Sequence, residues 1–194
     1  MRVQFYKPNA KVTGTACQFW VGDDGAIMGS LIKQDGWNQN TRSGSFAKNM
    51  NNPAKRVILK FSQAEVGEIV RAIDSNTTAQ TNGNDGFYHR SQNQITKIFF
   101  GPYVRGEQQV GYSYSVQKED KEDSTNKTNF LIGFTFAEGI VLKEALLCAL
   151  RESFVQAANP KNYKSQNKQS QPEQAPQPAQ QAQPVSQAFD DDEW

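Results

Sequence analysis

An internal repeat is the feature of this sequence that most constrains its fold. Residues 56–73, RVILKFSQAEVGEIVRAI, align without gaps on residues 129–146, NFLIGFTFAEGIVLKEAL. The alignment pairs Phe61 with Phe134, Ala64 with Ala137, Glu65 with Glu138 and Ala72 with Ala145. Earlier in the two halves, Phe5-Tyr6-Lys7 corresponds to Phe87-Tyr88-His89. This repeated order of matching segments indicates that one supersecondary unit occurs twice.

The pattern of elements within each half identifies that unit. β-Branched and aromatic runs bounded by Gly, Asn and Asp predict strands at 12–22, 25–34, 54–62, 94–104, 108–117 and 128–136. Apolar stripes at helical spacing predict helices from about residue 63 to 73 and from about residue 137 to 157. Each half therefore reads as four strands followed by a helix, with repeats of about 1–76 and 86–158.

A ββββα unit is too small to bury both its sheet and its helix alone. We therefore expect an α+β fold in which two tandem ββββα units, within residues 1–158, pack as a pseudo-dimer. The main alternative is an OB-fold β-barrel, because about five strands with long loops would give a similar composition.

The composition changes abruptly after residue 158. Residues 159–194 consist mostly of Gln, Pro, Ala, Ser and Asn, with too few apolar residues to offset the entropy of ordering, so we expect a disordered tail. Its three basic and five acidic side chains give it a net charge of −2, so residues 1–158 carry +3 of a chain total of +1. The body is thus mildly basic and the tail acidic.

The tail ends in AFDDDEW, where aromatic residues bracket clustered acids. Aromatic side chains are unusual in a segment that only aids solubility, so we interpret the tip as a short motif that binds protein partners. This motif comprises Phe189, Asp190, Asp191, Asp192, Glu193 and Trp194. The alternative is an acidic end that improves solubility and does nothing else.

Several function classes are excluded by what the sequence lacks. No apolar run is long enough to span a membrane and the start lacks a signal peptide, so we expect a cytoplasmic protein, in the host cytoplasm if it is viral. Cys17 and Cys148 show no metal-ligand spacing, and we expect both to be reduced and buried. His89 is the single histidine, and the signatures of NTPases, metalloproteases and α/β-hydrolases are missing. We therefore expect no enzyme activity, no cofactor and no metal.

A long polar segment, 35–52, interleaves aromatic and basic residues. Trp37 and Phe46 have no evident core to fill, while Arg42 and Lys48 supply positive charge. Aromatic faces alternating with cations are suited to stacking unpaired bases and neutralising their phosphates. We expect this segment to bind nucleic acid; alternatively, Trp37 and Phe46 fold back onto the sheet edge.

The predicted strand 108–117 alternates tyrosines with small residues. Tyr112 and Tyr114 share one face, and Gly111, Ser113 and Ser115 share the other. We expect the tyrosines to stack bases on an open sheet, although the same pattern fits a face packed under a helix. Basic residues in or beside strands are further candidates for phosphate contacts: Lys33, Lys55, Lys60, Lys97 and Arg105.

Two resemblances to known families follow from these features. The tandem of ββββα units with a basic, aromatic-bearing sheet, residues 1–158, resembles the Whirly and Pur-alpha families, whose members bind single-stranded nucleic acid on their β-surfaces. Separately, the Gln/Pro-rich segment ending in DDDEW is similar to the tails of bacterial and bacteriophage single-stranded DNA-binding proteins, which recruit replication and repair enzymes.

Both resemblances imply the same activity. We expect a single-stranded DNA-binding protein of a bacteriophage type that coats DNA without sequence preference in replication, recombination or repair, recruits proteins through its tip, and can form homo-oligomers. An RNA-binding protein or transcription regulator is the alternative among binding proteins. A metal-dependent nuclease would need Asp23, Asp24, Asp85 and Glu107 to converge. A scaffold that acts only through its tail would not bind oligonucleotides.

Overall fold

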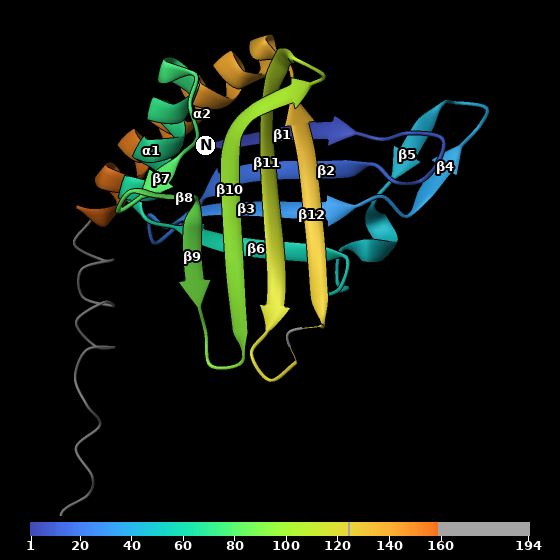
Figure 1. Cartoon of the computed structure of the whole chain (residues 1–194), viewed down its shortest axis with the longest axis horizontal. Coiled ribbons are helices and arrows are strands. Elements are labelled where there is room, and N and C mark those ends of the chain that lie inside the picture. The colour runs from blue at the N-terminus through green and yellow to red at the C-terminus, as the bar shows by residue number, and fades with distance from the viewer. Residues whose placement is uncertain (124, 159–194) are drawn as a thin grey trace, which may run out of the picture.

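Residues 1–123 and 125–158, which the computed structural model describes, form two four-stranded antiparallel sheets, two α-helices and two short hairpins (Figure 1). The first sheet contains, in spatial order, β1 (Arg2–Lys7), β2 (Thr15–Val21), β3 (Ile27–Lys33) and β6 (Arg56–Phe61). The second contains, in spatial order, β9 (Phe87–Arg90), β10 (Gln94–Arg105), β11 (Gln108–Asp120) and β12 (Lys127–Phe134).

Each sheet leads directly into a helix, α1 (Gln63–Ser75) after β6 and α2 (Phe136–Ala157) after β12. The connections hold the hairpins β4 (Gly36–Asn38) with β5 (Ser43–Ser45) and β7 (Gln80–Thr81) with β8 (Asn84–Asp85), and a 3-10 turn, η1 (Ala47–Asn49). The predicted α+β fold of two tandem ββββα units is confirmed. The OB-fold alternative is wrong, because the strands form two separate sheets rather than one barrel.

Both helices begin with the same capping arrangement, which explains part of the repeat. Ser62 precedes α1; its hydroxyl accepts from the Glu65 backbone N–H, and the Glu65 carboxylate accepts from the Ser62 N–H. Thr135 and Glu138 make the equivalent pair at α2. Such a capping box satisfies backbone donors that a helix start leaves unpaired.

The inner faces of the two sheets pack against each other and form one core. Figure 1 shows the strands of the second sheet crossing those of the first, with α1 and α2 side by side at one end. Aromatic rings join the sheets: the Phe19 and Tyr114 ring centroids lie 5.7 Å apart, and those of Phe5 and Phe134 lie 5.0 Å apart. Neither unit buries its sheet without the other.

The two units also exchange equivalent polar contacts. Lys7, in the first unit, pairs with Glu138 at the start of α2. His89, which the repeat aligns with Lys7, lies in the second unit, and its Nε2 is 2.7 Å from Oε1 of Glu65 at the start of α1. Burial alone would raise the pKa of the Glu138 carboxyl, but the hydrogen bonds from Lys7 and Thr135 outweigh it and hold that pKa below its ordinary value. This reciprocal pairing is a property of a pseudo-dimer.

Other expectations from the sequence have mixed outcomes. Cys17 is buried, as predicted, but Cys148 is exposed on α2, because it lies on the helix face turned away from the core. No helix within the described ranges is long and apolar enough to cross a membrane. The tail, 159–194, with its tip from Phe189 to Trp194, lies outside the described residues.

Candidate nucleic-acid interface

Each sheet has an outer face that no helix covers. In β6 of the first sheet, Val57 and Leu59 point into the core, so Ile58, which alternates with them, points outward and is 49% exposed. Register across the sheet places further aromatic, apolar and basic side chains on this outer face: Arg2, Tyr6, Trp20, Met28, Arg56 and Lys60. The face therefore offers apolar surface between positive charges.

The outer face of the second sheet is more open. Phe99, Ser115 and Leu131 lie side by side in register across β10, β11 and β12, and Tyr88 lies opposite Lys97. Tyr88 and Leu131 are 54% and 56% exposed. A shallow hollow of about 530 Å³ covers this area, and Gln117 and Asn129 also line it. Small Ser113 and Ser115 side chains leave the aromatic surfaces accessible.

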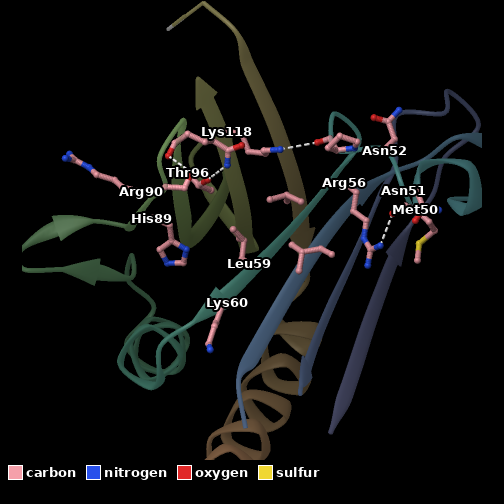
Figure 2. A pocket seen from close by; sticks show the side chains of 15 residues that line it. Met50, Asn51, Asn52, Arg56, Leu59, Lys60, His89, Arg90, Thr96 and Lys118 are labelled. Carbon is pink, nitrogen blue, oxygen red and sulfur yellow. Dashed lines mark hydrogen bonds between the residues drawn. The ribbon is translucent and has the colours of Figure 1, made fainter. Parts of the chain in front are cut away.

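A cleft of about 610 Å³ lies between the two sheets, where their edge strands β6 and β9 face one another (Figure 2). Four cationic side chains line it: Arg56, Lys60, Arg90 and Lys118. Arg56 Nη1 donates to the Met50 carbonyl at 2.8 Å, and Lys118 Nζ donates to the Pro53 carbonyl at 3.1 Å. The residues that line the cleft include no carboxylate. The cleft is thus positively charged and lies between the outer faces of the two sheets.

The prediction that Tyr112 and Tyr114 stack bases is wrong. Their side chains are 6% and 0% exposed, and Gly139 of α2 lies so close to Tyr112 that an added Cβ would be 2.6 Å from its ring. The Tyr112 hydroxyl donates to the Ile73 carbonyl at 3.1 Å. Burial raises the pKa of the Tyr114 phenol. Period-two alternation separates the two faces of β11, but it does not say which face a helix covers.

The segment 35–52 is a structured arm rather than an open loop. It contains the β4–β5 hairpin and η1, and the Asp35 carboxylate accepts from the backbone N–H of Lys48 at 2.6 Å. Trp37 is half-buried, and its indole N–H has no hydrogen-bond partner among the described residues. Phe46 packs on Tyr6 of β1 with ring centroids 5.9 Å apart. The arm therefore continues the outer face of the first sheet, with Arg42 and Lys48 exposed on it.

The five basic residues predicted for phosphate contacts do not form one surface. Lys60 lines the cleft, and Lys97 lines the hollow on the second sheet while pairing with Glu119 at 3.1 Å. Lys33 lies over the Phe130 ring, 5.2 Å from its centroid, and burial, then the charge of Lys55, lowers the pKa of its ammonium group. Lys55 is exposed, and Arg105 stacks on the Tyr103 ring at 5.3 Å.

Sequence reasoning missed most of the residues that line the open faces and the cleft, namely Tyr6, Arg56, Ile58, Tyr88, Arg90, Phe99, Lys118 and Leu131. The repeat held one usable signal, since it aligns Tyr6 with Tyr88 and both are more than half exposed. The cleft had no sequence signal, because its residues come from distant segments.

The carboxylates considered for a nuclease do not gather. Within residues 1–123 and 125–158, no three His, Cys, Asp or Glu side chains are placed to hold a metal ion. Asp24 accepts from the Ala26 N–H in the turn between β2 and β3, and Asp85 accepts from Gln80 within the β7–β8 hairpin. Both carboxylates therefore accept hydrogen bonds that stabilise local turns and hairpins.

Comparison with known proteins identifies the fold. No protein-family model and no curated protein matches this chain. Its structure is similar to WHY3 from Arabidopsis thaliana, with a TM-score of 0.55 and 14% identity over 86% of this chain and 96% of that one. WHY1 from Arabidopsis thaliana has a TM-score of 0.54 and 14% identity over 90% of this chain and 97% of its own. The plant transcriptional regulator PBF-2 has a TM-score of 0.50 and 14% identity over 89% of this chain and 97% of its own. These solved structures are Whirly proteins, and this chain has a Whirly-like fold.

Proposed function

We propose that residues 1–158 bind single-stranded DNA with little sequence preference. The observation that carries this proposal is the open outer face of the second sheet, where Tyr88, Phe99 and Leu131 lie beside Lys97. Every base has an apolar face, so stacking on aromatic side chains is tolerant of sequence. In a duplex those faces are covered by neighbouring base pairs, so single strands should bind more tightly.

The wider role follows from the tail and the same binding surface. We propose that the protein coats single strands in the cytoplasm during replication, recombination or repair, recruits other proteins through its tip, and catalyses no reaction. The fold, with two open faces and no clustered metal-ligating side chains in its described ranges, supports a binding protein. No cofactor or metal is needed for this activity.

We also propose that the protein forms homo-oligomers through α2. Five large apolar side chains lie on one side of this helix and are between 47% and 71% exposed: Phe136, Ile140, Val141, Phe154 and Val155. Large apolar side chains that are this exposed, at both ends of one helix, are typical of an interface.

Transcription regulation is a second candidate function. The specific observation in its favour is that PBF-2, which shares the fold, is a plant transcriptional regulator. A regulator would prefer particular sequences, whereas a coating protein would not.

A titration of the full chain with fluorescently labelled oligonucleotides tests these alternatives. We expect oligo-dT to bind more tightly than a duplex of equal length, and salt to weaken binding. Equal affinity for duplex at every salt concentration would contradict the proposal, and a strong preference for oligo-rU or for one sequence would favour the alternative. The oligonucleotide should stay intact when magnesium is added, because a nuclease would shorten it.

A further inference from the structure

The cleft between β6 and β9 is separate from the two outer faces but opens onto both of them. Ile58 and Lys60 belong to the outer face of the first sheet and also line the cleft. Arg90, which lies on the same side of β9 as Tyr88 on the outer face of the second sheet, lines it too, so a strand on that face can reach the cleft. Its volume of about 610 Å³ is within the range of roughly 300 to 1,000 Å³ that is typical of small-molecule sites. The cleft therefore holds a compact group rather than a long segment.

The lining combines three kinds of chemistry. Val57 and Leu59 form an apolar wall at the core side, and Thr96 lies beside them. Asn51, Asn52 and Gln94 contribute side-chain amides. The cations Arg56, Lys60, Arg90 and Lys118 complete it, without any carboxylate among the lining residues. An apolar wall suits a base, amides suit the polar edge of a base, and cations suit a phosphate.

Two of the cations are held in place before any ligand arrives. Arg56 donates one hydrogen bond to the Met50 carbonyl, and Lys118 donates one to the Pro53 carbonyl. Each side chain has further N–H groups that can bind a ligand. Figure 2 shows Lys118 reaching from β11 across to the turn at 51–53, which closes one end of the cleft. Cations fixed in advance lose less side-chain entropy on binding.

We propose that this cleft receives one nucleotide of the bound single strand, with its base against the apolar wall of Val57 and Leu59 and its phosphate near Arg56 and Lys118. The inference rests on the proposed function and adds a discrete site to a surface that otherwise only stacks bases. Contacts from the amides to base edges give that single position a base preference.

An acidic peptide is the other occupant that a basic cleft between two sheet edges could attract, by adding a strand to β6 or β9. The structure favours a nucleotide, because Lys118 and Pro53 close one end and an added strand needs an open path along the edge.

The single histidine makes the site directly observable. His89 lines the cleft and is the chain's one histidine, so selective 13C,15N-histidine labelling of the full chain yields one imidazole signal. We expect this signal to shift and saturate on titration with dT10, and to shift more weakly with dTMP. In parallel, dT10 carrying one 4-thiothymidine should photo-crosslink to a residue between 56 and 60 or between 89 and 96.

A matched pair of variants tests the phosphate contact. Lys118→Met should reduce the slope of log affinity for dT10 against log salt concentration by about 0.7, the amount expected for one phosphate of a single strand. Lys143→Met, on α2, should leave the slope unchanged, because Lys143 pairs with Asp74 at 2.7 Å away from the cleft. Equal slopes for Lys118→Met and the unmodified protein would overturn the assignment of Lys118.

The outcomes separate the two proposals. A fixed His89 signal with crosslinks confined to Tyr88 and Phe99, while dT10 still binds, overturns the nucleotide site and leaves single-strand binding intact. Absence of dT10 binding overturns both. A His89 shift caused by a synthetic AFDDDEW peptide but not by dT10 makes the cleft a peptide site and overturns the inference.

Discussion

Tyr88 and Phe99 are the side chains on which the proposed base stacking depends most directly. Both lie on the outer face of the second sheet, 54% and 36% exposed, and contribute little to the core. Replacing either by Ala should reduce the free energy of binding to oligo-dT by about 1 to 3 kcal/mol for each stacked base lost. Fluorescence anisotropy measures the loss, and thermal unfolding should change by no more than a few degrees. A large drop in unfolding temperature with unchanged affinity would assign the rings to packing.

Tyr114 allows the opposite experiment inside the core. Its hydroxyl is buried and has no hydrogen-bond partner among the described residues. An unpaired buried hydroxyl destabilises the folded state by about 1 to 3 kcal/mol, so Tyr114→Phe should raise the free energy of unfolding. Tyr112→Phe is the matched control: it loses the bond to Ile73 and should lower that free energy by about 1 kcal/mol. Denaturant titrations that rank the two variants in the reverse order would contradict this assignment.

The tyrosines also show how far residue-scale prediction can go. Alternation along 108–117 correctly separated Tyr112 and Tyr114 from Ser113 and Ser115. It could not decide which set faces outward, because both halves of the pattern contain residues that sheets tolerate on either face. Packing of Gly139 of α2 on Tyr112 and of Phe19 of the first sheet on Tyr114 decided it, and both contacts depend on residues distant in sequence.

At the scale of elements, the exchanged capping contacts should make stability depend on acid pH. The Glu138 carboxyl has a pKa below its ordinary value of 4.5, so its ionised form stabilises the folded state above that pH. The stabilisation is lost as the pH falls through the folded-state pKa. Glu138→Gln keeps the cap but not the charge pair with Lys7, and should lower the free energy of unfolding at pH 7 by about 0.5 to 1 kcal/mol, since the pair is partly exposed.

Unfolding followed from pH 7 to pH 3 checks this expectation. The difference between Glu138→Gln and the unmodified protein should shrink below about pH 4.5, the ordinary value for the group. Glu144→Gln changes an exposed carboxyl on the same helix and serves as the control. A difference that persists undiminished at pH 3 would mean that the charge of Glu138 is not its source.

Elements with strong local signals were predictable, and those without were not. The helices were foreseeable because apolar spacing marked them, and the main strands because β-branched runs did. The β4–β5 hairpin in 35–52 was missed, because its strands are three residues each and carry no alternation. The hydrogen bond from the Lys48 backbone N–H to the Asp35 carboxylate holds this segment in place as an arm. A sequence pattern does not reveal bonds to backbone N–H groups.

At the scale of the whole molecule, the cleft could not be predicted at all. Its lining comes from residues 50–60, 89–96 and 118, which meet because two sheets pack across each other. The repeat predicted that packing in outline, since a lone ββββα unit cannot bury its core. It did not predict the angle between the sheets, and the cleft lies where that angle separates β6 from β9.

The exposed side of α2 should control assembly. Ile140 and Val155 are 61% and 71% exposed, and burying them between copies of the chain would remove apolar surface from water. The double variant Ile140→Asp, Val155→Asp should therefore shift the protein toward a smaller species in sedimentation velocity runs at equal concentration. Lys11→Asp, at an exposed position outside α2, makes the same change in net charge and serves as the control. An unmodified protein that sediments as a monomer would rule out this interface.

The tail should act on the body through charge. Ser153 near the end of α2 donates to the Gly25 carbonyl at 2.7 Å and accepts from Gln63 at 3.3 Å, so the last described helix ends beside the start of α1, where β6 also ends. From the composition of residues 159–188 we expect random-coil behaviour, which for about 30 residues would span on the order of 30 Å, enough for the acidic tip to reach the basic side chains around β6. Tip and phosphates would then compete for the same cations.

Truncation after Ala188 should consequently raise the affinity for oligo-dT at low salt, because it removes four acids from a chain whose net charge is +1. The gain should fade near physiological ionic strength, where the Debye length is about 8 Å. Replacing DDDE at 190–193 by NNNQ keeps the length and should reproduce the gain, while deleting Trp194 alone should spare DNA binding and reduce capture of replication or recombination proteins. Because coupling is reciprocal, we expect DNA that displaces the tip to make it available to partners. Unchanged affinity after truncation at low salt, together with an unchanged set of captured proteins, would leave the tip as an aid to solubility.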